Sequence, residues 1–160
     1  MVDARSRIPG PPTPDPLSAY RLWLERFAPP HDKVREQFDN AITWMEANRS
    51  RLDEGILAAN DHPALAFNHV ISALTERCST DPAARSTIIT WLCENRRCPF
   101  GMTLKVKAFR VLRRCGAALG ADQVDRLRQL QAEADAMPYR PREVLQLDRL
   151  LAGFDQREER

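Results

Sequence analysis

Apolar residues recur every three to four positions along most of this 160-residue chain, which is the spacing of one face of an α-helix. The clearest stripe comprises Phe67, Val70, Ile71, Leu74 and Cys78. No segment sustains an alternation of apolar and polar residues, and neither Asn-Gly nor Asp-Gly occurs as a hairpin signal. The pattern therefore predicts an all-α protein.

Local start and stop signals divide this pattern into about eight helices. A polar residue followed by proline marks three starts, at Asp15-Pro16, His62-Pro63 and Asp81-Pro82, since proline is favoured in the first turn. The expected helices cover residues 16–27, a stretch from 32, a short segment around 52–57, about 63–78, a stretch from 82, about 103–119, a stretch from 122 and the residues after Pro141. Connections of a few residues favour antiparallel neighbours.

The chain is expected to form one folded domain with a tail. Residues 1–14 contain four of the twelve prolines and few apolar residues, which predicts a disordered, proline-rich tail. Residues 15–157 carry the helical pattern and are predicted to form a single all-helical domain, a size that can bury a substantial core.

One internal near-repeat bears on the architecture. Residues 42–49 read Ile-Thr-Trp-Met-Glu-Ala-Asn-Arg, and residues 89–96 read Ile-Thr-Trp-Leu-Cys-Glu-Asn-Arg, an offset of 47 residues. This offset lies in the range of two-helix HEAT or armadillo-type units. The match covers only eight positions, so we favour a HEAT-like helical stack and keep an irregular helical bundle as the alternative.

Composition limits the function classes. The net charge of +2 is too small for a uniformly basic nucleic-acid binder, so any electrostatic function must come from a local patch. No run of about 18 apolar residues occurs, so we expect no membrane insertion. The first 30 residues lack the apolar core of a signal peptide, which favours a cytoplasmic location and leaves open secretion by a signal-peptide-independent route.

The sixth expected helix carries the main candidate site. At about 100° per residue, its cations lie on the face opposite its apolar stripe, and two further arginines precede it. The candidate binding residues are Arg96, Arg97, Lys107, Arg110, Arg113 and Arg114. We predict a protein–protein interaction or adaptor module that presents this arginine-rich face to an acidic partner through charge-assisted hydrogen bonds. The oligomeric state is left open.

Three alternatives compete with that prediction. The same face suits nucleic-acid phosphates, although no exposed aromatic residues accompany it for base stacking. It is also typical of a solvated face whose arginines pair with acids of the next helix, namely Asp122, Asp125, Glu133 and Asp135.

The third alternative is a small cysteine-dependent enzyme. Cys98 follows two arginines, precedes a Pro-Phe-Gly turn, and is expected to be a partly exposed thiol. His31, His62 or His69 would have to supply the base, and nothing in the sequence brings one close. Enzymatic activity is therefore the less favoured class. Cysteine and histidine spacings match no zinc motif, so we predict no metal, no cofactor and no catalytic residues.

Overall fold

The computed structural model describes residues 15–28 and 31–158, without the side chains of residues 117 and 158, and every regular element in these ranges is helical. The α-helices are α1 (Pro16–Arg26), α2 (Asp32–Ala47), α3 (Glu54–Ala59), α4 (Pro63–Arg77), α5 (Pro82–Glu94), α6 (Gly101–Cys115), α7 (Ala121–Asp135) and α8 (Val144–Glu158). Two short 3-10 helices, η2 (Arg49–Arg51) and η3 (Gly116–Ala118), join them. The all-α prediction is confirmed for these ranges, whereas the predicted tail over residues 1–14 lies outside them.

The polar residues before three prolines cap their helices as expected. The Asp15 carboxylate accepts a hydrogen bond from the Ser18 N–H at 3.1 Å, and the Asp81 carboxylate accepts from the Ala83 N–H at 2.9 Å. His62 acts through its ring, since Nδ1 accepts from the Ala64 N–H at 3.1 Å. Each cap satisfies a backbone donor that the first helical turn leaves without a partner.

The sixth helix begins two residues before its predicted start, and its predicted end was wrong. The helix α6 begins at Gly101, where the Gly101 N–H donates to the Cys98 carbonyl at 2.9 Å, and it ends at Cys115 rather than near residue 119. At Gly116 the chain tightens into η3, and a Cβ there would lie 1.8 Å from Nη1 of Arg157 in α8. Glycine thus weakens the helix and leaves room for the Arg157 side chain.

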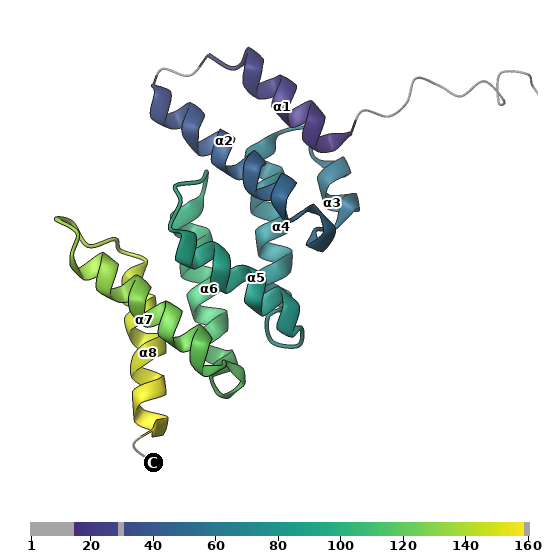
Figure 1. Cartoon of the computed structure of the whole chain (residues 1–160). Helices are drawn as coiled ribbons and strands as arrows, with labels where there is room; N and C mark the ends of the chain where they lie inside the picture. The colour runs from purple at the N-terminus through teal and green to yellow at the C-terminus, as the bar shows by residue number, and fades with distance from the viewer. Residues whose placement is uncertain (1–14, 29–30, 159–160) are drawn as a thin grey trace, which may run out of the picture.

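The helices form two rows, which can be followed in Figure 1. The helices α2, α5 and α7 lie in one row, and α4, α6 and α8 lie behind them. Within the second row α4 packs on α6 and α6 packs on α8, and across the rows α4 contacts both α2 and α5. The helices α1 and α3 contact each other and pack against α2 and α4, respectively. Consequently α6 lies near the middle of the molecule with neighbours on either side.

The core runs through all eight α-helices, from Leu17 in α1 to Leu151 in α8. Its centre is Phe67 of α4, whose ring lies 5.8 Å from the Trp44 ring and 6.1 Å from the Trp91 ring, both edge-on. Trp44 and Trp91 are the matching tryptophans of the two near-repeat segments. Both are buried, so they stabilise the core rather than anchor a surface contact.

Candidate functional site

The site helix α6 has two distinct faces because of its residue spacing. Leu104, Ala108, Phe109 and Leu112 are buried against the neighbouring helices. The opposite face combines basic and apolar side chains at intervals of three and four residues, which places them in one line along the helix. The buried stripe therefore fixes which residues α6 presents outward.

This outward face lines a groove of about 630 Å³. Its apolar part comes from Met102, Val106 and Val111, and Met102 is 54% exposed. Its basic part consists of Lys107, Arg110 and Arg114 of α6 together with Arg142, which precedes α8. The groove thus combines apolar side chains with four cationic ones.

The cations of the groove have few partners of their own. Lys107 Nζ lies 3.3 Å from Glu76 Oε1 of α4, an exposed pair that contributes little to stability. Within the described ranges, Arg110, Arg114 and Arg142 form no ion pair. None of the predicted acids of α7 pairs with a cation of α6 in these ranges, because α7 packs against α5 and α8 instead. These guanidinium groups therefore remain available to external carboxylates.

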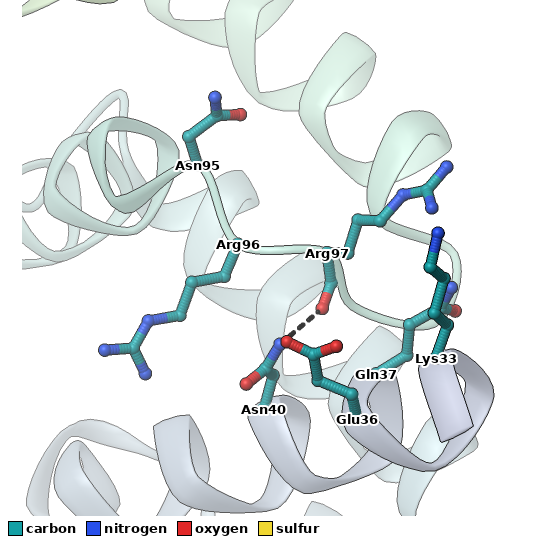
Figure 2. Close-up of a pocket in the computed structure, with 7 residues that line it drawn as sticks. All are labelled: Lys33, Glu36, Gln37, Asn40, Asn95, Arg96 and Arg97. Atoms are coloured by element: carbon teal, nitrogen blue, oxygen red, sulfur yellow. Dashed lines mark hydrogen bonds between the residues drawn. The ribbon is translucent and has the colours of Figure 1, made fainter.

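The structure distributes the six candidate cations over separate places. Lys107, Arg110 and Arg114 lie together in the groove, and Arg113 is exposed on α6 outside the groove lining. Arg96 and Arg97 instead line a second cleft of about 420 Å³, between α2 and the connection from α5 to α6 (Figure 2). That cleft is lined otherwise by polar side chains: Lys33, Glu36, Gln37, Asn40 and Asn95.

The connection from α5 to α6 is held at several points. The Asn40 side-chain amide of α2 donates to the Arg97 carbonyl at 3.0 Å. Asn95 and Phe100, at the two ends of the connection, have φ angles of 50° and 60°. Asparagine tolerates this left-handed conformation, whereas for phenylalanine it is strained. The ordered connection thereby determines where Arg96 and Arg97 stand.

The prediction that Cys98 is partly exposed was wrong, since only 7% of the residue is accessible. The middle of the connection folds inward, so that Cys98 and Pro99 are both buried between its two left-handed ends. Burial raises the pKa of the Cys98 thiol to about 11, with Lys105 and Arg96 opposing the shift. A buried, protonated thiol is a poor nucleophile at neutral pH.

Lys105 is a buried cation that the sequence analysis missed. Its Nζ donates to Asn95 Oδ1 at 3.2 Å, and burial lowers the pKa of its ammonium group, partly offset by Glu143. The only signal in the sequence is its place beside Leu104 on the buried stripe of α6. Arg142 was missed for another reason, because it lies outside any helix and joins the groove only through the packing of α8 on α6.

Neither a metal-binding cluster nor a membrane-spanning helix is found in the described part of the chain. No cluster of three or more histidine, cysteine, aspartate or glutamate residues within it could hold a metal ion. None of the helices in these ranges combines the length and apolar character that crossing a membrane requires.

Comparisons with known proteins add no constraint on these sites. No protein-family model, curated protein or solved structure matches the chain.

Proposed function

We propose that this protein is an interaction module whose α6 groove binds an acidic segment of a partner protein. The observation that carries the proposal is the combination of an apolar floor with cations on one helix face. Met102 and Val106 would receive apolar side chains of the partner, and Arg110, Arg114 and Arg142 would bind its carboxylates. Free guanidinium groups favour this role, since they need not break existing ion pairs to bind.

The apolar floor distinguishes this proposal from nucleic-acid binding. Phosphate backbones are bound mainly by cations, so a floor of aliphatic side chains adds nothing to their affinity. A protein segment, by contrast, gains from burying apolar surface in the same groove. Nucleic-acid binding through the same face is therefore the alternative outcome of the experiment.

We also propose that the scaffold is a HEAT-like helical stack with antiparallel neighbours rather than an irregular bundle. The near-repeat supports this reading, since its two tryptophans both contact Phe67 and its two asparagines, Asn48 and Asn95, both cap helix C-termini. The two rows in Figure 1 also agree with stacked helix pairs. Such a scaffold is rigid and suits partner binding through an exposed helix face.

Affinity capture from a cell extract tests the function with three baits. The groove variant is Lys107→Glu/Arg110→Glu/Arg114→Glu, and a control variant carries the same charge change at the exposed Arg26, Arg35 and Arg126. Each bait is used with and without nuclease. We expect wild type and control to retain the same acidic protein after nuclease treatment, and the groove variant to lose it.

Direct binding measurements with the purified partner candidate then distinguish protein binding from nucleic-acid binding. A Met102→Ser/Val106→Ser variant keeps every cation and removes apolar surface from the floor. It should weaken binding of a protein partner by about tenfold, since it removes buried apolar groups, and leave nucleic-acid affinity unchanged. Capture that disappears with nuclease, or that the groove variant retains in full, would contradict the proposal.

A further inference from the structure

The second cleft brings together cations from distant parts of the chain. Lys33 belongs to α2, whereas Arg96 and Arg97 belong to the connection between α5 and α6, and all three line the same 420 Å³ space. The hydrogen bond from Asn40 to the Arg97 carbonyl, 3.0 Å long, holds the two segments together. A tertiary contact thus maintains a concentration of positive charge.

The positive charge of this cleft is poorly compensated. Among the described residues that line it, Glu36 is the only carboxylate and stands against three cations, Lys33, Arg96 and Arg97. Among the described residues, Lys33 and Arg97 form no ion pair, and Arg96 has only Glu94, with Nε and Oε2 4.0 Å apart. Figure 2 shows the Lys33 and Arg97 side chains extending toward the same end of the cleft, whereas Arg96 extends the other way. Like charges held in one cleft favour a bound anion.

The backbone that carries Arg97 is held in place by contacts within the protein. Asn95 is bound from the core side by the buried Lys105, and Asn40 fixes the backbone at Arg97. The left-handed conformations of Asn95 and Phe100 persist because these contacts and the buried Cys98 hold the connection between them. A fixed backbone lowers the ordering cost of binding, because only the side chains of the cleft must become ordered around a ligand.

We propose that this cleft binds the phosphate group of a small phosphate-bearing molecule. Arg97 would offer its planar guanidinium to two phosphate oxygens, Lys33 would add a point charge, and the Gln37 side chain would supply an uncharged donor. Lys33 and Arg97, which extend toward the same end of the cleft, together carry two positive charges, and these suit a phosphate dianion better than a single carboxylate. The volume accommodates a phosphate with further atoms attached. This site is separate from the α6 groove, and the proposal does not depend on the function assigned to that groove.

Calorimetric titration of the full chain with inorganic pyrophosphate tests the proposal. Wild type should bind one pyrophosphate. Lys33→Gln/Arg97→Gln should weaken binding by at least about tenfold, the loss expected for charge-assisted hydrogen bonds. Arg97→Lys should lie between the two, because it keeps the charge and loses the planar fork. Arg110→Gln/Arg114→Gln, in the groove, is the matched control and should bind like wild type.

A variant that is expected to bind more tightly separates an effect on binding from a loss of folding. Glu36→Gln removes the only carboxylate of the lining and should tighten pyrophosphate binding several-fold. Side-chain amide NMR signals of Gln37 and Asn40 should shift on addition of pyrophosphate in every variant that binds. The proposal is overturned if wild type binds neither pyrophosphate nor phosphate, if succinate binds as tightly, or if the Lys33/Arg97 and Arg110/Arg114 variants lose affinity equally.

Discussion

Replacing Phe67 with alanine should destabilise this protein more than most single substitutions. The Phe67 side chain is completely buried in α4, which contacts α2, α3, α5 and α6. Its ring contacts those of Trp44 and Trp91, at centroid distances of 5.8 and 6.1 Å. The substitution therefore removes the ring that both near-repeat tryptophans contact.

The expected loss can be worked out from these contacts. A buried phenylalanine changed to alanine costs about 3–5 kcal/mol through lost burial and the remaining cavity. Two edge-on aromatic pairs disappear as well, each worth about 0.5–1.5 kcal/mol beyond burial. We therefore expect Phe67→Ala to lower the free energy of unfolding by about 4–5 kcal/mol, the upper end of the usual range. For a chain of this size, that corresponds to a fall in Tm of roughly 8–20 °C.

Urea denaturation followed by far-UV circular dichroism measures the free energy of unfolding. Phe67→Leu keeps most of the apolar volume and should lose less than Phe67→Ala. Leu22→Ala is the control for a generic truncation in a helix, because Leu22 is 52% exposed and should change stability by no more than about 0.5 kcal/mol. If Phe67→Ala costs less than about 1 kcal/mol, the reasoning that places Phe67 at the centre of the core is refuted.

Three further predictions concern single residues near the sites and the first helix. Phe100→Asn should raise the free energy of unfolding by about 0.5–1 kcal/mol in urea, because Phe100 is 54% exposed and asparagine tolerates its φ of 60°. The Arg49 guanidinium and the Ser18 N–H hold the pKa of Asp15 at about 2, so this carboxylate stabilises the fold above its unfolded pKa of about 3.9. Asp15→Asn should then be less stable than wild type at neutral pH, and urea titrations should show the difference shrinking as pH falls from about 4 toward 2. In native protein treated with iodoacetamide, mass spectrometry should find the half-buried Cys93 modified before the buried Cys98.

Each of these predictions has a contrary result. A destabilised Phe100→Asn would mean that the Phe100 ring contributes more packing than its exposure indicates. A stability difference for Asp15→Asn that is constant across acid pH would assign its effect to something other than the carboxylate charge. Rapid alkylation of Cys98 in the native state would restore the thiol as a candidate nucleophile.

Much of the fold is predictable from local signals, since its helix starts depend on neighbouring residues. Asp15, His62 and Asp81 each cap a helix beginning at the next residue, and proline in the first turn makes these starts easy to recognise. The end of α6 is different, because the chain tightens into a 3-10 turn at Gly116, where it lies beside Arg157 of α8, 41 positions further along the chain. A prediction from helix periodicity alone therefore places the end of α6 too late in the sequence.

The candidate site was predictable only where one helix forms it. Helical spacing alone places Lys107, Arg110 and Arg114 on one face of α6. Arg97 was grouped with them by proximity in sequence, but Asn40, 57 residues earlier, holds it at a different cleft. The burial of Cys98 likewise depends on left-handed residues at both ends of its connection, a conformation that no local pattern indicates for Phe100.

The separation between core and site residues makes the two proposals independently testable. Lys33, Arg97, Arg110 and Arg114 are all exposed, so their replacement should change binding with little effect on the free energy of unfolding. Phe100 is the exception, because it is strained, exposed and placed between the cleft and the groove along the chain. Strain retained in an exposed residue costs stability without improving the core. Phe100→Asn is expected to stabilise the fold. If it also weakens pyrophosphate binding or partner binding, the strained backbone at Phe100 contributes to the geometry of the cleft or of the α6 groove, respectively.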